Sequence, residues 1–176
     1  GVTETDTSKV PTASIKQHFA SNNNNPIYVD WTLIRKYVAT EPTVPSALEI
    51  KDLTPSAAIM NPQRKKIVIN TGASATPANY QVKIPVTYAA EMNTDFSDLR
   101  FVSKTGTNLD YWLESSTPGV TADVWVELAD VINASSSDYI YMHYGNPNLT
   151  SASNGTNTFD LFDEFNTDLF TDIGTG

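Results

Sequence analysis

The sequence contains no cysteine, few basic residues and no long apolar run. Without cysteine the chain can form neither a disulfide framework nor a zinc site with thiolate ligands, so packing alone must stabilise the fold. Asp and Glu number 20 against 11 Lys and Arg, and the formal net charge of -9 opposes binding to phosphate backbones and anionic membranes. We therefore expect no nucleic-acid partner.

The longest apolar runs, such as Ala57-Ala58-Ile59-Met60, are far shorter than the ~20 residues that a transmembrane helix needs. We expect no transmembrane segment. Gly1-Val2-Thr3-Glu4-Thr5-Asp6 has neither the basic nor the apolar region of a signal peptide, so any such segment is expected to have been removed or to lie upstream. The polar, Thr-rich composition is typical of a secreted protein, and we expect an extracellular or cell-surface location.

Short runs of aromatic and β-branched residues, each closed by polar residues, are the strongest pattern in the chain and indicate strands joined by turns. They recur at intervals of roughly ten residues, which is typical of a sandwich or jelly roll. We predict an all-β fold, an antiparallel β-sandwich of jelly-roll type. The predicted strands are residues 64–70, 80–88, 98–101, 109–114, 124–128 and 139–144.

Three local predictions refine this fold. Pro85 interrupts an otherwise regular alternation, so the strand from Tyr80 to Tyr88 should lie at a sheet edge or carry a bulge. The strand from Tyr139 to Tyr144 is large and mostly apolar on both faces, which places it centrally. Ala89–Asp98 is expected to hold one short helix, capped by Asp95 or Ser97.

The N-terminal region ends in a different kind of segment. Ile27 to Val38 alternates apolar and polar residues, which predicts a strand of roughly 40 Å at ~3.3 Å per residue. Glu41-Pro42-Thr43-Val44-Pro45 stops it, and we interpret Ala39–Ser46 as an interdomain linker. Three regions result: an N-terminal extension at 1–46, the sandwich at 47–158, and a C-terminal tail or start of a following domain at 159–176.

With these strands assigned, the chain from about Asn61 to Phe165 resembles DUF2341, a family of domains of unknown function in secreted and surface proteins of archaea and bacteria. The resemblance rests on Arg64-Lys65-Lys66-Ile67-Val68-Ile69, Tyr80-Gln81-Val82, Asp98-Leu99-Arg100-Phe101, Tyr111-Trp112-Leu113-Glu114-Ser115, Val124-Trp125-Val126, Ile140-Tyr141-Met142-His143-Tyr144-Gly145-Asn146-Pro147 and Phe162-Asp163-Glu164-Phe165.

The two flanks resemble parts of a concanavalin-like lectin or laminin-G-like sandwich. Phe162–Asn166 is similar to its opening strand and Tyr28–Val38 to its closing strand, so the closing strand comes first here. An isolated sandwich strand leaves an unpaired ladder and an uncovered apolar face. It can pair with the domain's own sheet or complete the sheet of a neighbouring copy by donor-strand addition. Alternatively, the chain is a cut from a longer repetitive protein.

No set of residues predicts catalysis, and we expect neither an enzyme nor a bound cofactor or metal. His18 and His143 have no partners at metal-ligand or triad spacing, and His143 is interpreted as a packed, hydrogen-bonded residue. Asp163 and Glu164 are adjacent, so in a strand they point to opposite faces and cannot act together on a glycosidic bond. A calcium site that includes Asp160 and Asp168 is the alternative use of these carboxylates.

Two sets of candidate binding and modification residues remain. Tyr111, Trp112 and Trp125 are candidates for a platform that stacks on sugar rings, with core packing as the alternative. Asn133, Asn148 and Asn154 begin glycosylation sequons in predicted loops. Chance alone explains this number of sequons in a chain so rich in Asn, Ser and Thr.

The leading hypothesis is a non-enzymatic structural or adhesive surface protein that assembles with copies of itself through its flanks. Its candidate self-assembly residues are Ile27, Val29, Trp31 and Leu33 in the N-terminal strand, with Phe159–Phe170 as the second flank. The alternative is a carbohydrate-binding module of a larger secreted enzyme or adhesin, with a polysaccharide as its partner.

Overall fold

The computed structural model describes residues 32–45, 48–50 and 63–164, all of which belong to one compact unit, residues 31–176. The described elements, in chain order, are β1 (Thr32–Ile34), β2 (Leu48–Ile50), β3 (Gln63–Asn70), β4 (Tyr80–Thr87), β5 (Arg100–Ser103), β6 (Asn108–Leu109), β7 (Tyr111–Thr117), β8 (Thr121–Leu128), β9 (Ser137–Tyr144), α1 (Gly155–Thr158) and β10 (Leu161–Asp163).

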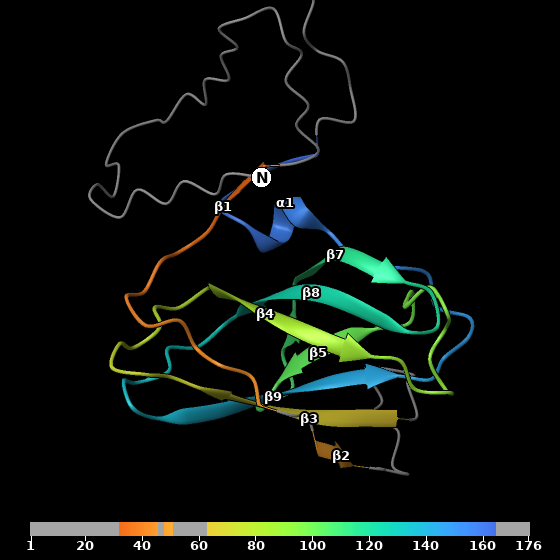
Figure 1. Cartoon of the computed structure of the whole chain (residues 1–176), viewed down its shortest axis with the longest axis horizontal. Helices are drawn as coiled ribbons and strands as arrows, with labels where there is room; N and C mark the ends of the chain where they lie inside the picture. The colour runs from red at the N-terminus through yellow and green to blue at the C-terminus, as the bar shows by residue number, and fades with distance from the viewer. Residues whose placement is uncertain (1–31, 46–47, 51–62, 165–176) are drawn as a thin grey trace, which may run out of the picture. The chain divides into compact units, whose positions relative to one another are not determined.

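Two antiparallel sheets pack face to face (Figure 1). The larger has the order β2-β3-β9-β5-β6, and the smaller has the order β4-β8-β7. The predicted all-β antiparallel sandwich is therefore confirmed. Two placements within it are confirmed as well: β4, which contains Pro85, lies at a sheet edge, and β9 lies between β3 and β5.

The core lies between the two sheets and follows from the alternation of apolar residues. In β4 the side chains of Tyr80, Val82, Ile84 and Val86 are buried, while Pro85 between them is exposed. Burying an aliphatic or aromatic side chain of this size contributes about 1.5 to 3 kcal/mol. Facing these residues from the other sheet are Ile67, Ile69, Phe101, Ile140, Met142 and Tyr144.

The predicted long N-terminal strand is wrong from Arg35 onward, since β1 ends at Ile34 and Arg35–Val38 is not a strand. Residues 27–31 lie outside the described residues. The chain leaves the strand because its side chains and backbone bond to β4: Arg35 donates to the Tyr80 hydroxyl at 3.1 Å, and the Lys36 N–H donates to Gln81 Oε1 at 3.2 Å.

Part of the predicted linker follows the sandwich closely. Val44 packs against the core, in which Val38, directly before the linker, is buried. Thr43 and Asn70 exchange two backbone hydrogen bonds, each of 2.8 Å, so this segment runs beside the end of β3.

Local hydrogen bonds override two further predictions. The helix expected in Ala89–Asp98 is absent, and the segment forms successive turns with Phe96 at a positive φ of 60°. Conversely, a four-residue helix, α1, occupies the end of a predicted loop. It begins at the cap residue Asn154, whose Oδ1 accepts the N–H of Asn157 at 3.0 Å.

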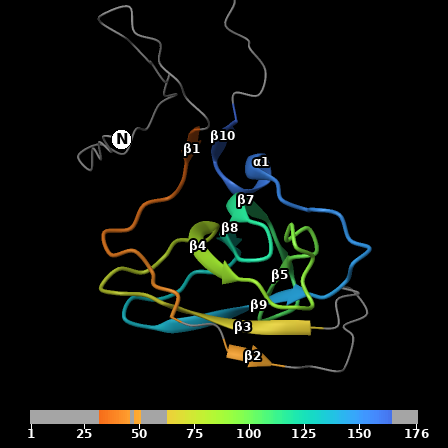
Figure 2. The ribbon, with the colours of Figure 1, turned by 45° about the vertical axis from the view of Figure 1, so that its right-hand side comes forward.

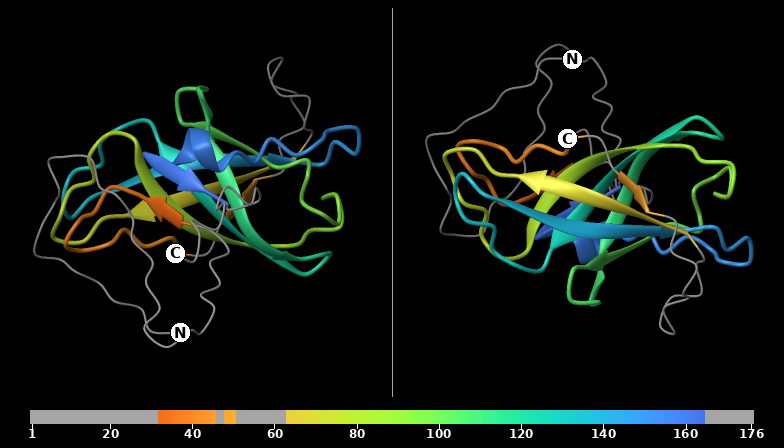
Figure 3. Two further views of the ribbon diagram at one scale, coloured as in Figure 1. Left: turned by 90° about the horizontal axis from the view of Figure 1, so that it is seen from above. Right: turned by 90° about the horizontal axis from the view of Figure 1, so that it is seen from below.

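The two flanks meet in a third, small sheet. β1 and β10 pair antiparallel through three residue pairs, Thr32 with Asp163, Leu33 with Phe162, and Ile34 with Leu161. We call this pair the β1–β10 ribbon; it lies beside α1, on the side of the smaller sheet that faces away from the core (Figures 2 and 3). Among the described residues, no helix has the length and apolar character needed to cross a membrane.

Candidate functional site

The β1–β10 ribbon is the first feature of the candidate site, because its pairing is incomplete. It has three residue pairs, and neither of its outer edges pairs with another described strand. Of the predicted self-assembly residues, Leu33 is half-buried in the ribbon, while Ile27, Val29 and Trp31 lie outside the described residues. A two-stranded ribbon this short is not stable alone in water, so it depends on what covers it.

Four aromatic side chains attach the ribbon and α1 to the smaller sheet. Phe162 of β10 lies edge-on to Trp112 of β7, with ring centroids 4.8 Å apart, and stacks on Phe159 at 5.8 Å. Phe159 in turn contacts Trp112 at 5.7 Å and Trp125 at 5.9 Å. We call Trp112, Trp125, Phe159 and Phe162 the aromatic cluster. It is the apolar layer that fixes the C-terminal flank to β7 and β8.

The polar atoms of the two tryptophans are also bonded. Trp112 Nε1 donates to Glu164 at 3.2 Å, and Trp125 Nε1 donates to Glu114 at 3.0 Å. Glu114 and Asp123 also pair with Lys83, at 2.7 Å and 3.2 Å. The indole groups are therefore held in place by carboxylates at the rim of the aromatic cluster.

Arg35 links the N-terminal flank to the smaller sheet. Its guanidinium group makes two hydrogen bonds to the Glu41 carboxylate, at 3.0 and 2.9 Å, and lies 5.1 Å from the centre of the Trp125 ring. The Tyr80 hydroxyl donates to the same carboxylate. Burial, together with the hydrogen bond to Glu41, raises the pKa of Tyr80 to about 12.

The predicted sugar platform does not share one exposed face in this fold. Tyr111 and Trp112 are successive strand residues and point to opposite sides of β7. Tyr111 is 2 % exposed and lies in the core, where its hydroxyl donates to Leu99 O at 3.0 Å. Trp112 is 5 % exposed beneath the phenylalanines, and Trp125 is half-buried between Arg35 and Lys83.

The three sequon asparagines are all exposed: Asn133 and Asn148 lie in loops and Asn154 lies at the start of α1. Two of them already make hydrogen bonds, one through its side chain and the other through its backbone carbonyl. The Asn154 side chain caps α1, so a glycan attached there would compete with the cap. Asn133 is tied through its carbonyl, which accepts the Thr71 hydroxyl at 2.5 Å. Glycosylation of these residues stays a prediction.

The carboxylates considered for calcium binding lie close together in the sequence. Asp160, Asp163 and Glu164 lie in or beside β10, and Asp168 is outside the described residues. His143 is buried in β9. Within the described ranges no three His, Asp or Glu side chains are grouped so that they could hold a metal ion.

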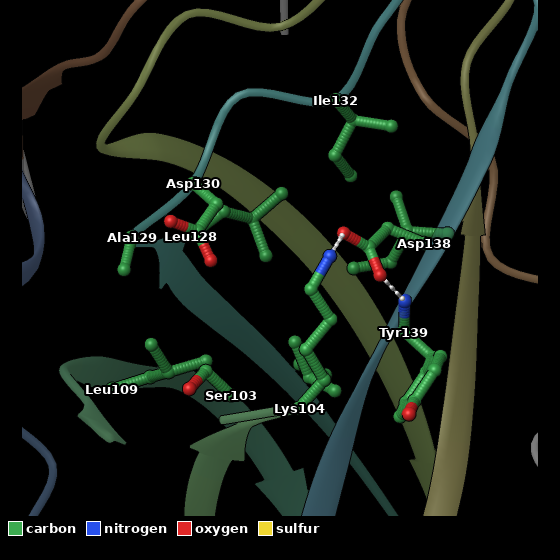
Figure 4. Close-up of a pocket in the computed structure, with 11 residues that line it drawn as sticks. Ser103, Lys104, Leu109, Leu128, Ala129, Asp130, Ile132, Asp138 and Tyr139 are labelled. Atoms are coloured by element: carbon green, nitrogen blue, oxygen red, sulfur yellow. Dashed lines mark hydrogen bonds and ion pairs between the residues drawn. The ribbon is translucent and has the colours of Figure 1, made fainter. Parts of the chain in front are cut away.

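A cavity at one end of the sandwich has a polar mouth (Figure 4). Lys104 pairs there with Asp138, whose other oxygen accepts the Tyr139 N–H at 2.8 Å. The cavity has a volume of about 20 Å³, which is room for a single water molecule, so it cannot hold a substrate.

A larger groove of about 530 Å³ lies between the turns before β5 and the loop after β9. Hydroxyl and amide groups line it, from Asn93, Thr94, Ser97, Thr150 and Ser151, together with the carboxylate of Asp95. Hydrogen bonds from the hydroxyl and the N–H of Ser97 hold the pKa of Asp95 below its ordinary value. The groove is open and polar, which suits a ligand rich in hydroxyl groups.

Residues 95–173 match the model of a family described as a domain of unknown function, DUF2341. The predicted resemblance is confirmed for this part of the chain. β3 and β4 precede the matched residues, although both belong to the same sandwich. No curated protein and no solved structure matches the chain.

Several residues on which the resemblance rests contact one another across the fold. The buried carboxylate of Asp98 accepts the N–H of Gly145 at 2.6 Å and that of Asn93 at 3.0 Å. Trp112 bonds to Glu164, and its ring contacts Phe162. These motifs therefore hold strands and loops together. Sequence reasoning missed the aromatic cluster; the close spacing of Phe159 and Phe162 before Glu164 was its only local signal.

Proposed function

We propose that this chain is a non-enzymatic structural or adhesive β-sandwich of an extracellular or cell-surface protein, which assembles with copies of itself by strand complementation. The observation that carries the proposal is the β1–β10 ribbon, a pair of three-residue strands with no further described strand at either outer edge. Such an edge presents backbone N–H and C=O groups that a strand from another chain can bond.

The flanks also differ from both sheets of the sandwich in their connections. β1 and β10 pair with each other and with neither sheet, so they form the start of a separate sheet. This arrangement fits their resemblance to the closing and opening strands of lectin-like sandwiches. A strand from a second copy, added at an open sheet edge, would make a head-to-tail contact, and repeated contacts of this kind build a filament.

The test is light scattering and negative-stain electron microscopy of the chain at several concentrations. A deletion of residues 1–34 removes β1 but keeps Arg35 and its contacts, and it should abolish ordered assemblies. A deletion of residues 1–26 keeps Ile27 to Ile34 and serves as the matched control, which should assemble like the full chain. Assembly that survives the longer deletion would overturn the proposal.

A carbohydrate-binding module is the second candidate. The observation in its favour is the open groove of about 530 Å³ lined by hydroxyl and amide side chains. It does not require the flanks. A full chain that stays monomeric at every concentration would overturn self-assembly and favour this candidate, which a polysaccharide-binding assay then tests directly.

A further inference from the structure

The outer edge of β4 pairs with no other described strand. β4 is the terminal strand of the smaller sheet and pairs in unbroken register with β8. Tyr88 donates its N–H to Val120 O at 3.0 Å, so the alternation of an antiparallel ladder directs the even-numbered residues of β4 toward β8. The backbone groups of Lys83, Pro85 and Thr87 then point outward. Pro85, which lacks an N–H, sits where an edge strand tolerates it.

The opposite edge of the same sheet is bonded differently. At β7 the N–H of Leu113 donates to the Ser153 hydroxyl at 2.8 Å, and Tyr111 O accepts the N–H of Asn154 at 2.8 Å. The loop before α1 therefore satisfies the first half of that edge. No described strand does the same for Lys83–Thr87. Of these two edges, that of β4 is the one at which a further strand can pair along Lys83–Thr87.

A groove of about 360 Å³ runs beside this edge. Core side chains from both sheets line it, including Ile67 and Met142 from the larger sheet and Ile84 and Val86 from β4, together with Val44 and Pro45. An apolar cavity of ~150 Å³ already holds a benzene ring, so this groove has room for more than one apolar side chain.

We propose that this edge and groove accept residues Ile27–Trp31 of a second copy of the chain as an added strand of the smaller sheet. The inference rests on the proposed self-assembly and names its acceptor. Ile27, Val29 and Trp31 alternate with Tyr28 and Asp30, so in a strand three apolar side chains share one face. That face suits the groove when Ile27 and Val29 lie beside Ile84 and Val86, and Tyr28 and Asp30 would then lie outward beside Pro85 and Thr87.

The lengths also agree. Ile27–Trp31 extended covers ~17 Å at ~3.4 Å per residue, and Ile84–Tyr88, which continues the ladder of β4, covers the same distance. Because the segment directly precedes β1, its insertion into a neighbour leaves the pairing of β1 with β10 in its own chain intact.

The first test uses disulfide formation, because the chain has no cysteine of its own. Two single variants, Asp30→Cys and Thr87→Cys, are mixed and oxidised, and mass spectrometry identifies the mixed dimer. Asp30→Cys mixed with Ser116→Cys is the matched control, since Ser116 is exposed on β7, at the other edge of the smaller sheet. Preferential cross-linking to position 87 supports the proposal. Equal cross-linking to both positions overturns it.

The second test weakens the acceptor edge. Thr87→Pro removes an outward N–H and should weaken association at least tenfold, whereas Thr87→Ala keeps the N–H and should change it by about twofold or less. If Thr87→Pro assembles as strongly as the unaltered chain, the acceptor lies elsewhere and self-assembly itself still stands. If the unaltered chain does not assemble at all, both proposals are overturned.

Discussion

Replacing Gly155 with alanine tests whether the aromatic cluster is rigid. Gly155 is the first residue of α1 and is buried against Phe162. A Cβ at this position would overlap Cε1, Cζ and Cδ1 of the Phe162 ring. None of these contacts is tolerable, so either the ring or the helix must move.

Two opposing effects decide the free energy of unfolding of Gly155→Ala. Alanine is favoured over glycine in a helix by about 1 kcal/mol. Against this, the ring of Phe162 is held between Phe159 and Trp112, and overpacking a well-filled site costs about 1 to 3 kcal/mol. Each aromatic pair that is disrupted loses about 0.5 to 1.5 kcal/mol more. We expect a net destabilisation of about 1 to 3 kcal/mol.

The sign of the effect should reverse when the ring is removed. In a Phe162→Ala background the clash is gone, and Gly155→Ala should then stabilise the protein by up to about 1 kcal/mol through helix propensity alone. Urea unfolding followed by tryptophan fluorescence measures all four proteins of the cycle. Thr156→Ala, an exposed change in the same helix, is the control. Equal effects of Gly155→Ala in both backgrounds would refute a rigid contact with Phe162.

Two further predictions concern single buried groups. Because the folded state holds the Tyr80 proton up to about pH 12 while the unfolded state releases it near the ordinary pKa of 10.0, stability should fall as the pH rises between these values. Tyr80→Phe should remove that part of the fall in urea unfolding at alkaline pH; an identical pH profile in the variant would contradict the assignment. Asp98→Ala leaves the N–H groups of Asn93 and Gly145 without their acceptor and should cost about 2 to 4 kcal/mol, measured as a lower thermal midpoint, whereas a loss below about 0.5 kcal/mol would show that the carboxylate is dispensable.

The strands of the sandwich could be predicted because their pattern is local. In β4, β8 and β9, apolar residues either alternate with polar ones or occupy both faces, and eight residues are enough to show this. Such a pattern is sufficient to predict a strand of a half-buried or buried sheet. Pro85 indicated that β4 is an edge strand for the same reason, because its missing N–H is a property of that residue alone. The DUF2341 motifs made the family assignment more specific, but they indicated no catalytic or binding chemistry.

The candidate site could not be predicted in the same way, because its contacts join distant segments. Tyr111 and Trp112 are adjacent and both aromatic, yet one lies in the core and the other lies under Phe162. Nothing local distinguishes an exposed stacking platform from a covered one. Likewise α1 has no apolar periodicity and is stabilised by the cap at Asn154. A segment of four residues is too short for its sequence to predict such a helix.

The two flanks are attached with unequal strength, which supports the N-terminal flank as the donor in the proposed self-assembly. β10 is fixed by the Phe162 ring, by the bond from Trp112 to Glu164 and by α1 directly before it. β1 has three residue pairs with β10, and its next anchor is Arg35. β1 is therefore the less firmly held of the two strands, whereas separating β10 would uncover Trp112. The N-terminal flank is the one that can engage a second copy while the C-terminal flank stays packed on its own sheet.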